Sequence, residues 1–229
     1  MNQDSTARRQ LWSHFIEITK ESFRFLEGRF GFRPLSATSE QIPYQSSEVL
    51  VNVFYRRLGG ELGVEFGMLP EPGRAEAGGE FWRALFPSRE RLPKTEARIP
   101  VYELKVALPV LVPPALMPAE LRKLLGDRQA KEFDPLETWD SWWSTFSASN
   151  LREVDIGVRR LAVITLEYAS PLLTGDREAF RKVQEYNAQL TDQYSRKVHL
   201  GFLPKPLAEA LKDKPLSEII QARKEREGW

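Results

Sequence analysis

The chain has 229 residues, no cysteine, and a formal net charge of +1 from 33 basic and 32 acidic side chains. A chain of this length can bury a core without cross-links, and the lack of cysteine excludes disulfides, thiolate metal sites and cysteine nucleophiles. The balanced charge gives no overall field that would attract nucleic acid or an anionic membrane. The longest apolar stretch, Val106 to Met117, contains three prolines and cannot form a continuous membrane-spanning helix. We therefore expect no nucleic-acid or membrane partner, and a cytoplasmic protein.

The N-terminal region predicts a helix followed by a loop. Apolar residues at steps of three and four favour a helix from about Arg8 to Glu27, ended by Gly28 or Gly31. The stretch from Pro34 to Ser47 is rich in Ser, Pro and Gln and predicts a connection, although the first strand could begin inside it.

The strongest pattern in the chain predicts a β-hairpin. Apolar and polar residues alternate from Val49 to Arg56 and again from Glu61 to Met68, with Gly59-Gly60 between the two runs. A phosphate-binding loop would need its glycines between a strand and a helix. We therefore assign the glycine pair to the turn, and Gly63 and Gly67 to a bulge or a close backbone approach.

Later segments are mostly helical. Residues 102–108 fit a third strand, and nearly as well a short helix leading into Pro109. Helices are expected within residues 150–168 and 177–200, with Gly175-Asp176 closing one helix and capping the next.

These elements predict an α+β fold, in which a small antiparallel sheet containing the hairpin packs against helices. We expect a single domain over residues 1–229. It would consist of a helix-plus-sheet portion, residues 1–115, and a helical portion, residues 116–229.

An aromatic cluster is the first candidate site. Trp139, Trp142, Trp143 and Phe146 fall on one face of a predicted helix. Facing solvent, this cluster would be a hot spot for protein binding. Facing inward it would be core, which we favour because large exposed apolar patches are uncommon on soluble monomers.

Two sets of acidic residues are candidates for chemistry. Glu61 and Glu65 share one face of the second hairpin strand, where paired carboxylates could support metal or glycosidic chemistry, but alternation places them in water. His14, Glu17 and Glu21 align on the first helix, yet a metal motif needs further ligands. No serine-nucleophile or zinc-helix motif occurs. We expect no catalytic residue, metal or cofactor.

Several short motifs stand in a fixed order along the chain. They are a helix before an FGF turn, a tyrosine-led strand, an ELGV strand and a late helix end: Phe25-Leu26, Phe30-Gly31-Phe32, Tyr44, residues 49–55, residues 61–64, Tyr168-Ala169 and residues 172–176. In these motifs the chain resembles a set of uncharacterised bacterial cytoplasmic proteins. Some similar small proteins look like immunity proteins of bacterial toxin systems. The resemblance implies a protein that binds and neutralises a toxin, without catalysis.

The sequence thus leads us to expect a monomeric or weakly dimeric, non-catalytic protein that binds another protein. Charged hairpin residues would rim the binding surface. The candidate partner-binding residues are Arg56, Arg57, Glu61, Glu65, Trp139, Trp142 and Trp143. A carboxylate- or metal-dependent enzyme and a structural subunit of a larger assembly are the alternatives.

Overall fold

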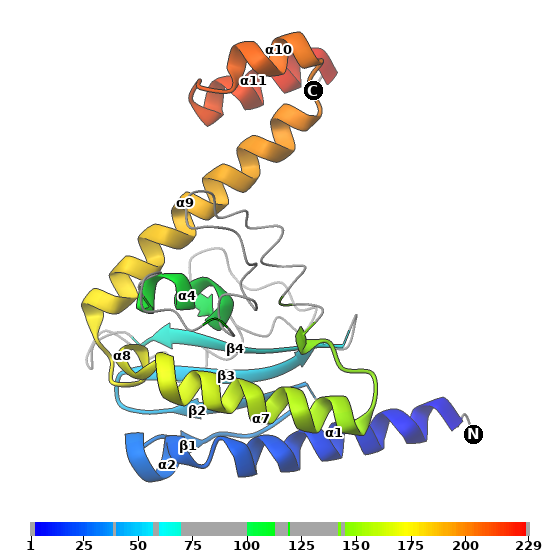
Figure 1. Cartoon of the computed structure of the whole chain (residues 1–229), viewed down its shortest axis with the longest axis vertical. Helices are drawn as coiled ribbons and strands as arrows, with labels where there is room; N and C mark the ends of the chain where they lie inside the picture. The colour runs from blue at the N-terminus through cyan, green and yellow to red at the C-terminus, as the bar shows by residue number, and fades with distance from the viewer. Residues whose placement is uncertain are drawn as a thin grey trace, which may run out of the picture. The chain divides into compact units, whose positions relative to one another are not determined.

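The computed structural model describes residues 3–38, 40–56, 60–69, 100–112, 119, 142 and 145–227. The chain divides into two compact units, Met1–Val183 and Gln184–Trp229, and the expectation of a single domain stays a prediction. The first unit is an α+β fold and the second is helical, as Figure 1 shows. Each is described by itself.

The first unit begins with two helices where the sequence predicted one. Helix α1 spans Gln3–Ser22 and α2 spans Phe25–Phe30, with Phe23 buried at the break. Gly31 ends α2 with φ of 68°, and its N–H donates to the carbonyl of Leu26. Glycine suits this position because it adopts positive φ without steric cost.

A five-stranded antiparallel sheet follows, with the strands adjacent in chain order. The predicted hairpin is confirmed as β3 and β4, in which Val53 pairs with Val64 and Arg56 with Glu61. The stretch predicted as a connection instead contains a separate strand, β2, which pairs antiparallel with β3. The strand bounds are β1 Arg33–Pro34, β2 Gln41–Gln45, β3 Val49–Arg56, β4 Glu61–Met68 and β5 Val101–Glu103.

The turn of the hairpin is tied to a segment far along the chain. Gly60 has φ of 73°, and its carbonyl accepts from Ala148 N at 2.8 Å. The Tyr55 hydroxyl donates to Ala148 O at 2.8 Å, and Glu61 forms an isolated antiparallel bridge with Ser147. These contacts hold the segment that leads into the next long helix against the hairpin end.

Residues 102–108, predicted as a strand or a short helix, form the end of a strand and then the start of a helix. Strand β5 ends at Glu103, and α4, Leu104–Leu111, begins at the next residue. Helix α7 spans Leu151–Tyr168, and Asn150 caps it by accepting the N–H of Glu153 at 3.0 Å. Helix α8, Ser170–Leu173, follows α7 directly.

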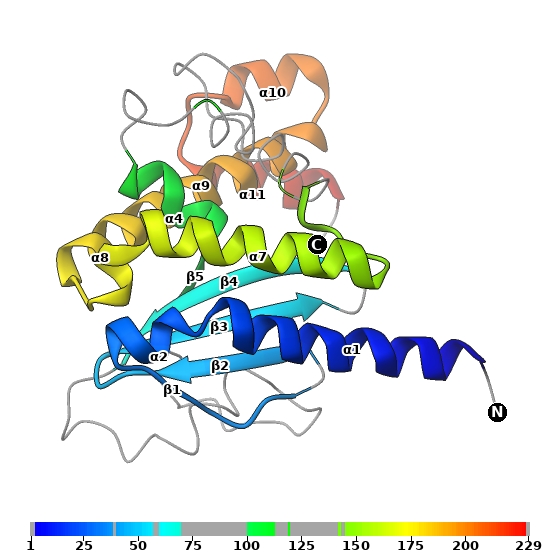
Figure 2. The same ribbon diagram turned by 60° about the horizontal axis from the view of Figure 1, so that its bottom comes forward.

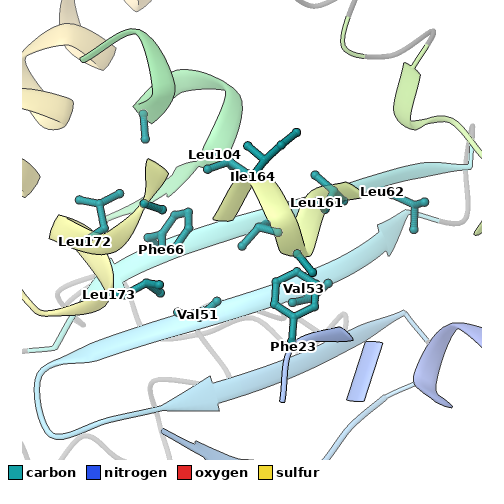
Figure 3. Close-up of a cluster of buried hydrophobic side chains, with 14 of the residues drawn as sticks. Phe23, Val51, Val53, Leu62, Phe66, Leu104, Leu161, Ile164, Leu172 and Leu173 are labelled. Atoms are coloured by element: carbon teal, nitrogen blue, oxygen red, sulfur yellow. The ribbon is translucent and has the colours of Figure 1, made fainter. Parts of the chain in front are cut away.

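Helices α1 and α7 pack beside each other on one face of the sheet, as Figure 2 shows. Odd-numbered residues of β3 and even-numbered residues of β4 point to this face because side chains alternate along a strand. Figure 3 shows this core, in which aliphatic and aromatic side chains from sheet and helices meet: Phe23, Val51, Val53, Leu62, Phe66, Leu161, Ile164, Leu172 and Leu173.

The second unit consists of helical residues and their short connections. Helix α9 spans Arg177–Gly201, and its residues from Gln184 onward belong to this unit. Two shorter helices follow: α10, Lys205–Leu211, and α11, Leu216–Glu227. Its buried apolar side chains are Leu190, Leu203 and Ile219. No helix among the described residues has the length and apolar character required to cross a bilayer.

Candidate functional site

Among the described residues, a dense group of ionisable side chains lies on the sheet face opposite the core. Arg56 on β3 stands across from Glu61 on β4, and Glu65 stands across from Glu103 on β5. Lys105 lies two residues after the end of β5, as the second residue of α4. The antiparallel register brings these side chains together from three strands and a helix start.

Four of these residues form a closed ring of alternating charge, named the charge ring: Arg56, Glu61, Lys105 and Glu103. Arg56 Nη1 donates to Glu61 Oε2 at 2.8 Å, and Lys105 Nζ donates to Glu61 Oε1 at 2.9 Å. Lys105 Nζ also lies 2.6 Å from Glu103 Oε2, and Arg56 Nη2 lies 2.6 Å from Glu103 Oε1. Each carboxylate is therefore shared between the same two cations.

Glu65 lies beside the charge ring and is held more weakly. Its Oε1 is 3.3 Å from Arg56 Nη2, a nitrogen that already contacts Glu103. Its Oε2 accepts from Asn52 Nδ2 at 3.1 Å, so its second partner is a neutral amide. Asn52 is buried, and its Oδ1 has no hydrogen-bond partner among the described residues.

Burial differs sharply around the ring. The Lys105 and Glu61 side chains are 2% and 5% exposed, whereas that of Arg56 is 42% exposed. The Arg56 guanidinium lies 4.4 Å from the centroid of the Phe54 ring, a cation–π geometry. The Phe54 ring in turn packs over Gly63, where a side chain would collide with it. This close approach agrees with one of the roles predicted for that glycine.

The environment shifts the pKa values of the facing residues Glu65 and Glu103 in opposite directions. Burial, followed by the negative charge of Glu103, raises the pKa of Glu65, although hydrogen bonds from Asn52 and Arg56 oppose this. Burial alone would raise the pKa of Glu103, but the charges and hydrogen bonds of Lys105 and Arg56 outweigh it and lower that pKa. Arg56 is held in its charged form because the carboxylates around it outweigh its own desolvation and raise its pKa.

All six carboxylate oxygens of the three glutamates accept from a nitrogen donor at 3.3 Å or less. A metal ion would have to displace these donors, because it binds the same lone pairs. Within the described ranges, no group of three or more His, Cys, Asp or Glu side chains is placed to hold a metal ion. The arrangement is suited to fixing strands β3, β4 and β5 together.

Three predicted site residues, Arg56, Glu61 and Glu65, do come together. The expectation that alternation places Glu61 in water is wrong, because this residue is buried. Sequence reasoning missed Glu103 and Lys105, which are brought in by the pairing of β4 with β5. The only local signal was the charged residues alternating with apolar ones in the segment that begins at β5.

The structure corrects the assignment of Trp142 as a partner-binding residue. Its side chain is buried, and its ring centroid is 4.5 Å from that of Phe146. Trp142 is therefore part of the core and offers no surface to a partner. Trp139, Trp143 and Arg57 lie outside the described residues.

The His14, Glu17 and Glu21 set lies on α1, but Glu21 is engaged elsewhere. Its carboxylate accepts from Arg159 of α7, with Nη1 at 3.2 Å from Oε1. This ion pair is exposed and links the two helices that cover the sheet. Exposed pairs of this kind contribute little to stability.

A second surface feature, on α7, was not predicted. Ile156 and Val163 are 54% and 53% exposed, although the opposite side of the same helix is buried in the core. At 3.6 residues per turn, a spacing of seven places the two side chains on nearly the same line of the helix. We call the exposed stripe the α7 outer face; it comprises Arg152, Ile156, Arg159, Arg160, Val163 and Glu167.

No protein-family model matches the chain, and neither the curated proteins nor the solved structures contain a match. The likeness to small bacterial proteins and to immunity proteins therefore stays a prediction.

Proposed function

We propose that this protein acts by binding another protein, without catalysis of its own, and that the α7 outer face is the binding surface. The observation that carries the proposal is the exposure of Ile156 and Val163 on one line of a helix whose opposite side is core. Branched aliphatic side chains at a spacing of two turns are typical anchors for a partner surface.

The charges around these two residues indicate the chemistry of the partner. Arg159 is already held by Asp155 and Glu21. For Arg152 and Arg160, the described part of the chain provides no carboxylate partner, although Arg160 lies 5.9 Å from the Phe146 ring centroid. We therefore propose a partner that places apolar side chains over the stripe and acidic groups beside it.

The stripe lies on a helix that is capped and packed against the sheet and α1, and a surface formed before binding lowers the entropic cost of association. Helix α7 is capped by Asn150, and buried residues along it, such as Val158 and Leu161, fix it to the sheet and to α1. Among the partner-binding residues predicted from the sequence, Arg56 keeps a substantial exposed area. It offers a polar contact on a different part of the first unit.

The biological role that fits this proposal is that of a bacterial cytoplasmic immunity-type inhibitor, which occludes a toxin by covering its surface. The resemblance carried by the FGF turn, the two hairpin strands and the helix end at residues 172–176 supports this role. An enzyme that uses carboxylates or a metal, and a structural subunit, remain alternative predictions. The closed charge ring gives the enzyme less support, because its carboxylates are occupied by cations.

The test uses the proteins encoded by neighbouring genes as binding candidates, measured by calorimetry against the full chain. Ile156→Asp and Val163→Asp should each weaken binding by about 30-fold or more, the effect of a hot-spot residue. Both variants should keep the thermal unfolding curve of the parent, because both side chains are exposed.

Leu151→Asp is the matched control. Leu151 is also exposed and lies on α7, but on a different side of the helix from the α7 outer face. Its replacement should leave affinity unchanged. Equal binding by all three variants, or no binding by any neighbouring gene product, would contradict the proposal.

A further inference from the structure

The charge ring is complete without Glu65. Two carboxylates and two cations alternate around it, and the four contacts are 2.6 to 2.9 Å long. The ring is therefore neutral in itself. An ionised Glu65 would add a fifth, unbalanced charge to a mostly buried group, which is costly.

We infer that Glu65 carries a proton in the folded protein at pH values where exposed glutamates are ionised. In the described part of the chain, the charged groups around it are Arg56, Glu61, Glu103 and Lys105, all members of the charge ring. Of the three glutamates, Glu65 has the longest contact to a cation and the only contact to a neutral donor. A proton taken up by the group is therefore bound at Glu65.

Asn52 provides a partner for both forms of Glu65. The amide now donates from Nδ2 to Glu65 Oε2, which suits the carboxylate. Its buried Oδ1 has no donor. A half-turn of the amide presents Oδ1 to Glu65, where it accepts the O–H of the carboxylic acid. Burial and the neighbouring Glu103 raise the pKa of Glu65, in agreement with this geometry.

The inference fixes the sign of the pH dependence. A carboxyl group whose pKa is raised by folding stabilises the folded state fully at pH values below the ordinary glutamate range, and this contribution is lost as the pH rises through the raised value. Glu103 acts in the opposite sense: its pKa is lowered, so its contribution is present above the ordinary range and is lost as the pH falls through the lowered value.

Carbon-13 NMR of the glutamate Cδ atoms in the full chain tests the inference directly. One glutamate should titrate above the exposed ones, and its signal should disappear in Glu65→Gln. The signal should remain in Glu17→Gln, a control at an exposed position of α1. A Glu65 signal that titrates together with the exposed glutamates, or below them, would overturn the inference.

Urea unfolding as a function of pH gives a second readout. Glu65→Gln should remove the loss of stability with rising pH that Glu65 causes, and should unfold no more easily than the parent at neutral pH. Glu103→Gln should instead be destabilised at neutral pH. A Glu65→Gln variant that is destabilised at neutral pH would count against the inference, and the NMR titration decides the matter even if Glu103→Gln does not fold. Neither readout depends on the α7 outer face.

Discussion

The two faces of the sheet are both buried, but they are stabilised by different physics. On the helix-covered face, Val53 and Phe66 pack among apolar side chains, and contacts of this kind have no fixed direction. On the other face, Glu61 and Lys105 require specific partners at hydrogen-bond distance. The comparison teaches that strand alternation assigns residues to two faces but does not say whether either face meets water.

Lys105→Met should destabilise the protein most strongly, more than a truncation on the helix-covered face. It leaves Glu61 and Glu103 with Arg56 as their shared cation, and breaking a buried ion pair by removing one partner costs about 3–5 kcal/mol. Urea unfolding at neutral pH measures the loss.

The double variant Lys105→Met/Glu61→Gln distinguishes the loss of charge balance from the change in side-chain packing on this face. The second change removes the Glu61 charge, which no longer has Lys105 as a partner. The double variant should therefore recover part of the stability lost in Lys105→Met, with a coupling of about 0.5–3 kcal/mol. Strict additivity of the two single changes would contradict the balanced-ring description.

Leu62→Ala probes the opposite face one residue away from Glu61. Leu62 is fully buried and packs over Gly157 of α7. Its truncation should cost about 2–5 kcal/mol, since it removes apolar contacts and leaves a cavity. The loss should be the same at neutral and acid pH, whereas the loss caused by Lys105→Met should shrink as the pH falls, because Lys105 stabilises the ionised form of Glu103. Equal pH dependence of both losses would contradict the distinction between the two faces.

Gly60→Ala tests the end of the hairpin, where Gly60 contacts Ala148. The residue has φ of 73°, and an added Cβ would lie 2.5 Å from the carbonyl oxygen of Ala148. Strain and overpacking of this kind cost about 1–3 kcal/mol, measured by thermal or urea unfolding.

Gly28→Ala is the matched control for that substitution. Gly28 lies in α2, and nothing lies within 4 Å of its ideal Cβ. Its replacement should be neutral or stabilise by less than about 1 kcal/mol. Equal losses at both glycines would show that the close approach to Ala148 is not the cause.

Much of the fold could be predicted because its signals are local. Alternation located β3 and β4, helical spacing located α7 and α9, and Gly175 was recognised as a helix end, where the structure has φ of 75°. The change from β5 to α4 was harder. The strand forms because Val101–Glu103 pairs with β4, and no local pattern reports a partner 34 to 38 residues away.

The candidate site was predicted only in part for the same reason. Glu61 and Glu65 were correctly placed on one face, but alternation alone could not reveal that Lys105 reaches Glu61 across the sheet. Trp142 followed its aromatic spacing into the core, which was the favoured interpretation. The α7 outer face was overlooked because single exposed aliphatic residues are common on soluble proteins and give no signal of their own.

The tie between the hairpin end and Ala148 also bears on how the chain matures during synthesis. The hydrogen-bond acceptor of the Tyr55 hydroxyl lies 93 positions further along the chain. The tip of the hairpin therefore reaches its final form only after the ribosome has released the segment that leads into α7. Contacts this distant in sequence slow folding, because a long loop must close before they can form.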